Sequence, residues 1–362
     1  MNTSRLIETF SRYVACDSES GNELKFAELL EGELQNLGFS VLRDAAQEKC
    51  GSNGFNIYGF LQGVGEPILF SAHMDTVSPG VGIEAVVEDG VIRSKGDTIL
   101  GADDKAGIAA VVEAVTTLKE QKLTHRPIEV LFTVAEEIGL LGAKYADYSN
   151  IKSTEAIILD SSNIGEMVTR APAMAEMFVE VIGKSAHVAT PEKGIHALKA
   201  AAAAVSAIPC GKVDEQTVCN VANFRSEGPS NVVPERARFE IDLRSFDADL
   251  LKRHMADIEA MVKAAAESFG AQYEVQATQK TEVLSIPSDR PIIGRLQAAY
   301  AALGTTGQIT KAYGGSDATW IFANGIDAIN VGIGMMDVHS TNEHISVADL
   351  EHTTKLVLSM MQ

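Results

Sequence analysis

The chain has 362 residues, a length that favours two domains over one. Apolar residues make up 46% of it and charged residues 22%, which is typical of a globular protein with a core large enough to hold a rigid site. The formal net charge of -19 argues against a nucleic-acid-binding protein, because binding phosphates requires clustered lysine and arginine.

The first half of the chain alternates between helical and strand-like segments. Apolar residues recur at helical spacing over 6–14 and 24–37, and Gly38 is placed to end the second helix. Strand-like segments lie at 55–62, 67–71, 129–134 and 156–159, with an alanine-rich helix at 106–118. This alternation predicts an α/β domain with a mixed, mostly parallel sheet flanked by helices.

The pattern changes near residues 171 and 172. Alternating strands at 176–182, 236–244 and 271–283 are separated by helices at 194–208 and 250–269. Such alternation predicts an antiparallel sheet that is covered on one side. A strand at 328–333 and a helix at 347–361 then resume the first pattern. We therefore predict a catalytic domain at 1–171 and 285–362, interrupted by an α+β domain at 172–284.

Nothing in the sequence indicates export or a membrane anchor. No apolar stretch reaches the roughly eighteen residues of a membrane span, and the first sixteen residues read as an amphipathic helix rather than a signal peptide. The four cysteines lie far apart without a CxxC pair, as expected of reduced thiols. We expect a cytoplasmic protein with no membrane or nucleic-acid partner.

Acidic residues and histidines gather where predicted strands end. His73 and Asp75 follow the strand at 67–71, Glu136 and Glu137 follow the strand at 129–134, and Asp160 ends the strand at 156–159. Side chains at such ends point into the crevice beside an open α/β sheet. These carboxylates would repel one another without a positive charge among them. A pair of divalent metal ions is the simplest answer.

Each motif by itself also allows a structural interpretation. His73 and Asp75 could be solvated loop residues, Glu136 and Glu137 an exposed acidic turn, and Asp103 a helix cap. In the metal interpretation, His73 is a ligand that Asp75 orients from behind. Glu137 is then a ligand, and Glu136 serves as general base and acid on the attacking water.

A last candidate ligand follows the strand at 328–333. We interpret His339 as a ligand and His344 as a structural or solvated residue. The candidate ligands are then His73, Asp103, Glu137, Asp160 and His339. If they share one bridging carboxylate, each of two ions receives three protein ligands. Nitrogen and oxygen ligands of this kind suit zinc, with cobalt or manganese as alternatives.

Taken in order, four motifs resemble the dinuclear-zinc metallopeptidases that include peptidase T, glutamate carboxypeptidase, aminoacylase and succinyl-diaminopimelate desuccinylase. The motifs are His-Met-Asp-Thr at 73–76, Gly-Ala-Asp-Asp-Lys at 101–105, Glu-Glu-Ile-Gly at 136–139 and His339. The run at 101–107 looks most like peptidase T, an aminotripeptidase. The resemblance implies that Asp103 bridges the ions, that His73 and Asp160 complete one shell, and that Glu137 and His339 complete the other.

The resemblance also assigns roles in and beside the inserted domain, which it identifies as a lid and dimerisation module. His187, in the run Gly-Lys-Ser-Ala-His, would stabilise the oxyanion, in dimeric members from the partner subunit. The alternative is a histidine on an edge strand with no such role. Asn231 and Arg244 would grip the substrate carboxylate, and the loop with Gly315 and Asp317 would lie near the metals. We therefore expect a homodimer that acts on small peptides.

One departure from peptidase T concerns specificity. That enzyme carries an arginine immediately before the corresponding Gly-Gly loop, where this chain has Tyr313. The first expectation is a metal-dependent exopeptidase resembling aminotripeptidases. A dipeptidase or an N-acyl amino acid amidohydrolase could use the same ligands and base. A more remote alternative is a metal-binding protein without catalytic activity.

Overall fold

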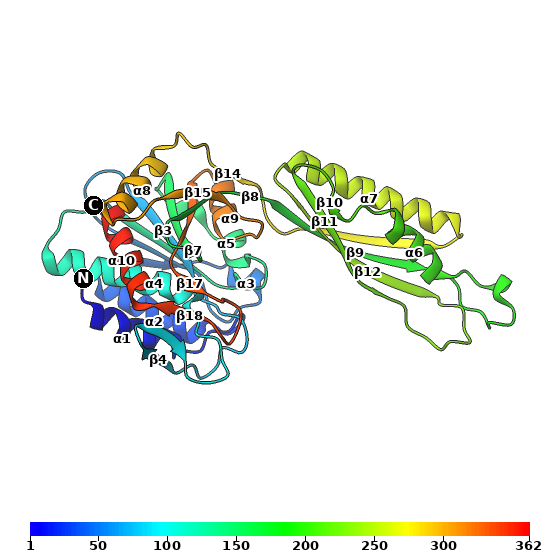
Figure 1. The fold of residues 1–362 in the computed structure, drawn as a ribbon, viewed down its shortest axis with the longest axis horizontal. Helices are drawn as coiled ribbons and strands as arrows, with labels where there is room; N and C mark the ends of the chain where they lie inside the picture. Colours follow the sequence, from blue (N-terminus) through cyan, green and yellow to red (C-terminus); the bar gives the residue numbers. More distant parts are fainter. The chain divides into compact units, whose positions relative to one another are not determined.

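The computed structural model describes residues 1–362, which form two compact units (Figure 1). The first unit contains Met1–Arg170, Ser285–Ala312 and Ser316–Gln362. The second contains Ala171–Leu284 and Tyr313–Gly315. The chain leaves the first unit after Arg170 and returns to it at Ser285, close to the boundaries predicted from the sequence. One segment differs, because Tyr313–Gly315 lies with the second unit although patterning assigns it to the catalytic domain.

Two contacts explain why Tyr313–Gly315 belongs to the second unit. Arg244, on strand β12 (Arg236–Ser245), donates a hydrogen bond from Nη1 to the carbonyl oxygen of Tyr313 at 2.8 Å. The ring of Phe246 packs edge-on against Tyr313, with ring centroids 5.6 Å apart. Both contacts join residues distant in sequence, so local patterning could not reveal them.

The first unit is built on a nine-stranded sheet. Its strands in spatial order are β1 (Ser40–Arg43), β2 (Ile57–Leu61), β6 (Ile128–Thr133), β3 (Ile68–His73), β7 (Glu155–Ser161), β16 (Asp327–Gly332), β8 (Glu166–Ala171) and β14 (Leu284–Ser285), with β15 (Gln308–Lys311) beside β8. The neighbours β6, β3, β7 and β16 are parallel, so their carboxyl ends share one edge. Strands β3 and β6 are buried along their whole length, as parallel strands usually are. The predicted mixed, mostly parallel sheet is confirmed.

Helices and a small sheet complete the first unit (Figure 1). The helices are α1 (Thr3–Val14), α2 (Leu24–Asn36), α3 (Gln47–Cys50), α4 (Ala102–Gln121), α5 (Leu141–Tyr145), α8 (Pro291–Ala302), α9 (Ala318–Ala323) and α10 (Val347–Met361). The small sheet has the order β17 (Met335–Met336), β18 (His344–Ser346), β5 (Val91–Ser94) and β4 (Ala85–Glu88). Gly38 follows α2 with a φ of 88°, as a glycine that ends a helix commonly does. None of the helices combines the length and the apolar character that a transmembrane span requires.

The second unit is a five-stranded antiparallel sheet with two helices, α6 (Ala197–Ala207) and α7 (Ala248–Ser268). Its strands in spatial order are β10 (Gly211–Lys212), β11 (Thr217–Arg225), β12, β9 (Ala173–Ile182) and β13 (Gln272–Gln279). Alternate residues of β9 and β12, such as Val179 and Phe239, join the buried core with apolar residues of the helices. The predicted antiparallel sheet is confirmed.

In the second unit, sequence patterning missed β10 and β11 and misplaced the boundaries of several other elements. A bulge between Ala222 and Arg225 interrupts the alternation of β11, and most of that half of the strand is exposed. Helix α6 begins three residues later than predicted, because Ile195 pairs with Lys184 in an isolated bridge. Strand β13 ends at Gln279 rather than near residue 283.

Candidate metal centre

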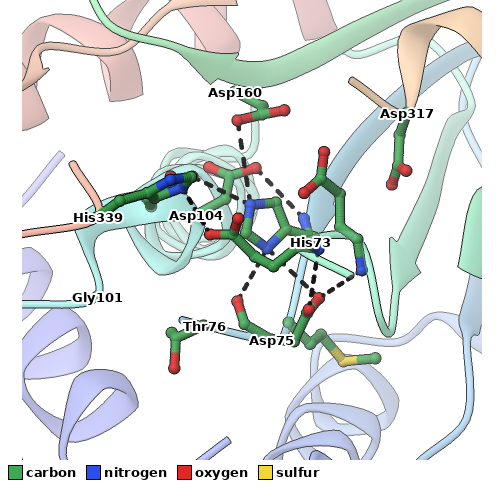
Figure 2. A network of polar contacts seen from close by, with 12 residues as sticks. His73, Asp75, Thr76, Gly101, Asp104, Asp160, Asp317 and His339 are labelled. Atoms are coloured by element: carbon green, nitrogen blue, oxygen red, sulfur yellow. Dashed lines mark hydrogen bonds and ion pairs between the residues drawn. The ribbon is translucent and has the colours of Figure 1, made fainter. Parts of the chain in front are cut away.

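The predicted ligands come from segments that end at the same edge of the large sheet. His73 is the last residue of β3, Asp160 lies near the end of β7, and Glu137 follows β6. His339 lies in the loop between β17 and β18, and Asp103 lies in the first turn of α4. Figure 2 shows His73, Asp160 and His339 directed toward one another. The parallel strand order therefore brings His73, Glu137 and Asp160 to one edge, where Asp103 and His339 contact them.

Asp103 lies at the middle of this group. Its Oδ1 is 3.0 Å from His73 Nε2, and its Oδ2 is 3.1 Å from His339 Nε2. His73 Nε2 also lies 4.0 Å from an oxygen of Asp160. His339 Nε2 also lies 2.9 Å from Glu137 Oε1. The two oxygens of Asp103 thus face two different sets of ligands, as a bridging carboxylate would.

The residues present fit a pair of cations. Ligand atoms of His73, Asp103 and Glu137 lie within 4.8 Å of one another, and so do those of His73, Asp104 and Asp160. Asp104 Oδ1 is buried without a hydrogen-bond partner, which is costly for a carboxylate unless a cation is near. A set of imidazole nitrogens and carboxylate oxygens suits zinc, cobalt or manganese.

Burial and mutual repulsion act on the carboxyl groups of the centre. Burial raises the pKa of Asp160 well above its ordinary value, and the charge of Asp103 raises it further. Burial likewise raises the pKa of Glu136, opposed by His73 and reinforced by Asp160. These shifts show how unfavourable the cluster is when no cation balances it.

The imidazoles partly compensate for this repulsion. Hydrogen bonds from His339 and His73 outweigh burial and hold the pKa of Asp103 below its ordinary value. The same contact with Asp103, together with Glu137, raises the pKa of His339 to about 10. The contacts with Asp103 and Glu137 therefore favour the protonated form of His339.

Asp75 contacts both His73 and the turn that carries the glutamates. His73 Nδ1 lies 2.9 Å from the backbone oxygen of Asp75 and 3.6 Å from its carboxylate. The carboxylate accepts hydrogen bonds from the backbone N–H groups of Glu136 and Glu137, at 2.9 and 3.2 Å. Asp75 thus fixes the orientation of one ligand and the path of the turn after β6.

Comparison with known proteins places this arrangement in a family. The model of the peptidase family M20/M25/M40 matches residues 69–362, which include every predicted ligand. The chain belongs to this peptidase family. The uncharacterized protein YqjE of Bacillus subtilis is 33% identical to this M20 peptidase over 366 residues, covering 100% of this chain and 99% of the relative. Peptidase T of Haemophilus influenzae is 26% identical over 312 residues, covering 83% of this chain and 72% of the relative.

Solved structures agree with the assignment to the M20 family. A tripeptidase from Staphylococcus aureus shares 32% identity with a TM-score of 0.96, covering 100% of this chain and 98% of that one. The aminopeptidase PepT from Bacillus cereus shares 33% identity with a TM-score of 0.95, with the same coverage. An M20 protein of Bacillus subtilis described as a dinuclear metal binding peptidase has the same fold at 16% identity and a TM-score of 0.74. The chain is therefore a hydrolytic peptidase of the M20 family.

The residues predicted to bind substrate in this M20 peptidase come from both units. Asp317, which caps α9, is 2% exposed, and its Oδ2 accepts a hydrogen bond from Thr133 Oγ1 at 2.5 Å. Burial raises the pKa of Asp317 to about 6. Arg244 already donates to Asp242 through Nε and Nη2, both at 2.8 Å, besides its bond to Tyr313. Gly315 lies in the segment that this bond to Tyr313 holds.

His187 and Asn231 lie together in the second unit, away from Arg244. His187 pairs with Val232 in an isolated bridge, and the backbone N–H of Val188 donates to Asn231 at 2.9 Å. Both His187 and Asn231 are exposed. Strand β12 begins soon after Asn231 and carries Arg244 near its end. His187 and Asn231 therefore lie at one end of this sheet and Arg244 at the other. Within one copy of the second unit, the three side chains form no single site.

Sequence reasoning missed several carboxylates that support the centre. Asp104 Oδ2 accepts a hydrogen bond from the backbone N–H of His73 at 3.3 Å. Glu23 accepts one from the backbone N–H of Ala135 at 3.0 Å, and Glu343 accepts three from the segment that carries Asp103. The only local signal was the proximity of Asp104 and Glu343 to predicted ligands.

Proposed function

We propose that this M20 peptidase is a metal-dependent exopeptidase that hydrolyses short peptides in the manner of an aminotripeptidase. The observation that carries the proposal is the position of Asp103, with one oxygen toward His73 and the other toward His339. Relatives described as a tripeptidase and as PepT, at 32% and 33% identity, support a peptide substrate. Zinc is the ion that we expect in the active protein.

The ligands and Glu136 would divide the work of hydrolysis. A pair of divalent ions held by the five ligands would polarise the scissile carbonyl and make a water easier to deprotonate. Glu136 is 8% exposed and lies in the turn directly after the buried strand β6. A carboxylate at this position could take a proton from water and then deliver it to the leaving amine.

The role of Glu136 can be tested against that of its neighbour. We expect Glu136→Gln to lower kcat by about 100- to 10,000-fold and leave uptake of two ions unchanged, because a general base is lost but no ligand. Glu137→Gln is the matched control and should lose one ion. Steady-state rates together with metal analysis measure both effects. An active Glu136→Gln variant would refute this assignment.

A second candidate activity is supported by Tyr313. This residue stands where peptidase T has an arginine, and its side chain is 55% exposed. A dipeptidase or an N-acyl amino acid amidohydrolase would not need that cation. A panel of tripeptides, dipeptides and N-acyl amino acids, assayed with added zinc, cobalt or manganese, distinguishes the activities. Cleavage of tripeptides with a free amino terminus in preference to the other classes supports the first proposal.

We further propose a homodimer formed through the second unit. The proposal rests on the family resemblance and on the separation of His187 from Arg244 along the sheet. A partner subunit could supply the histidine that the same copy of this unit does not place beside Arg244. Light scattering on the purified protein tests the oligomeric state. A monomer at working concentration would refute the proposal.

A further inference from the structure

Glu343 connects the loop of His339 to the segment of Asp103. It lies four residues after His339, and its side chain is 2% exposed. Its Oε2 accepts hydrogen bonds from the backbone N–H groups of Leu100 and Gly101, both at 2.8 Å. Its Oε1 accepts one from the backbone N–H of Asp103 at 3.0 Å. One side chain therefore holds three amides on a segment more than 200 residues away in the chain.

The position of Glu343 is costly for the metal-free protein. A buried carboxylate loses its hydration, and this one adds negative charge beside a cluster that is already acidic. Three backbone hydrogen bonds offset part of that cost. A carboxylate can accept all three at once, because both its oxygens are acceptors, whereas an amide side chain has only one acceptor oxygen.

The segment held by Glu343 needs this restraint. Gly101 has a φ of 76°, and Asp103 and Asp104 have non-helical backbone angles inside the first turn of α4. Asp103 is therefore not fixed by the regular hydrogen bonds of the helix. Its carboxylate must nevertheless keep one oxygen toward His73 and the other toward His339.

We propose that Glu343 is a positioning residue of the metal centre, which acts through the backbone of Asp103 and ties it to the His339 loop. The inference rests on the proposed function, because it takes Asp103 and His339 as ligands. Partners that orient ligands commonly change metal affinity 10- to 100-fold when they are removed.

The test replaces the carboxylate with a group of nearly the same shape. In Glu343→Gln, the amide NH₂ must replace one of the two oxygens. Either the backbone N–H of Asp103 or those of Leu100 and Gly101 then lose their acceptor. We expect the affinity for Zn²⁺ to fall about 10- to 100-fold. Titration of Zn²⁺ into chelator-treated protein, in competition with a chromogenic chelator, measures this change.

Glu129 offers a matched control within the same unit. It is fully buried, and it accepts hydrogen bonds from the backbone N–H groups of Lys152 and Ser153 and from the hydroxyl of Tyr58. None of these partners is a candidate ligand. We expect Glu129→Gln to lower the thermal unfolding temperature and leave Zn²⁺ affinity unchanged.

Each outcome bears on the proposal. Loss of Zn²⁺ affinity in Glu343→Gln but not in Glu129→Gln supports the proposal. Wild-type affinity in Glu343→Gln, or an equal loss in Glu129→Gln, overturns the proposal and leaves the proposed function standing. If the wild-type protein takes up no Zn²⁺, the proposed function fails as well. Should Glu343→Gln not fold, amide hydrogen exchange in the wild-type protein decides. Slow exchange of the Asp103 amide that slows further when Zn²⁺ is added supports the proposal. Fast exchange of that amide both with and without Zn²⁺ overturns it.

Discussion

The carboxylate of Asp103 lies between His73 and His339, so in the metal-free protein one negative charge is shared by two imidazoles. His339 has a pKa of about 10 because of its contacts with Asp103 and Glu137, whereas an unfolded histidine titrates near 6.5. The folded protein therefore holds this proton more tightly than the unfolded chain does. Between these two pH values, the metal-free protein loses stability as pH rises.

Metal uptake should consequently release protons. One ion would bind His73 and the other His339, and each must displace a proton from its imidazole. We therefore expect the observed heat at pH 8 to depend on the ionisation enthalpy of the buffer. Calorimetric titration of Zn²⁺ in two buffers measures the number released. In His339→Gln that number should fall by about one. Heats that do not depend on the buffer would contradict this account of the centre.

At the scale of elements, helix α5 packs closely on the end of β6 and so determines where the turn with Glu136 and Glu137 begins. A Cβ on Gly142 would lie 2.1 Å from the backbone oxygen of Val134 and 2.9 Å from Asn56 Oδ1. Asn56 itself bonds the backbone at both places, accepting from Val134 N and donating to Gly142 O. Only glycine fits at this position, which is the second residue of α5 and lies against the end of β6.

We therefore expect Gly142→Ala to lower the free energy of unfolding by about 1–3 kcal/mol, because the strand end must move to admit the methyl group. Displacement of Val134 should also reduce kcat, since Glu136 follows two residues later. Gly32→Ala is the control. Gly32 lies in α2 with no atom near the added Cβ, so alanine should raise stability by up to about 1 kcal/mol. Denaturant unfolding compares the two variants, and equal effects would contradict the packing argument.

At the scale of the whole molecule, all five candidate ligands belong to the first unit, and the second unit has its own hydrophobic core. The points at which the chain leaves and re-enters the first unit also lie side by side. The backbone N–H of Ile286 donates to the oxygen of Thr169 at 2.9 Å, so the two ends of the interruption are adjacent. We therefore expect the first unit to bind the metal ions without help from the second.

This separation predicts the behaviour of a shortened protein. Replacing residues 171–284 with a short glycine–serine linker should leave a folded first unit that still binds two ions, because no ligand is removed. Peptidase activity should be lost, since the predicted oxyanion and carboxylate contacts from His187, Asn231 and Arg244 are gone. Circular dichroism, Zn²⁺ titration and a tripeptide assay measure these properties. A folded product that binds no metal would show that the second unit shapes the centre.

Much of the fold could be predicted from the sequence because its signals are local. The parallel strands β3, β6 and β7 appear as short apolar runs. A candidate ligand lies near the end of β3 and of β7, and another follows β6 within a few residues. The inserted unit is visible because β9 and β12 alternate regularly. By contrast, β11 was missed because its outer half is exposed and bulged, so no apolar alternation marks it.

The sequence by itself determined the set of candidate ligands. His73, Glu137, Asp160 and His339 lie at or soon after the end of a strand, and Asp103 lies at the start of a buried helix. Only the tertiary structure decided how they are arranged. It placed one oxygen of Asp103 toward His73 and the other toward His339, and it brought Glu343 to the backbone of Asp103. These contacts depend on the spatial order of strands and on hydrogen bonds across more than 200 residues, which no local pattern of side chains encodes.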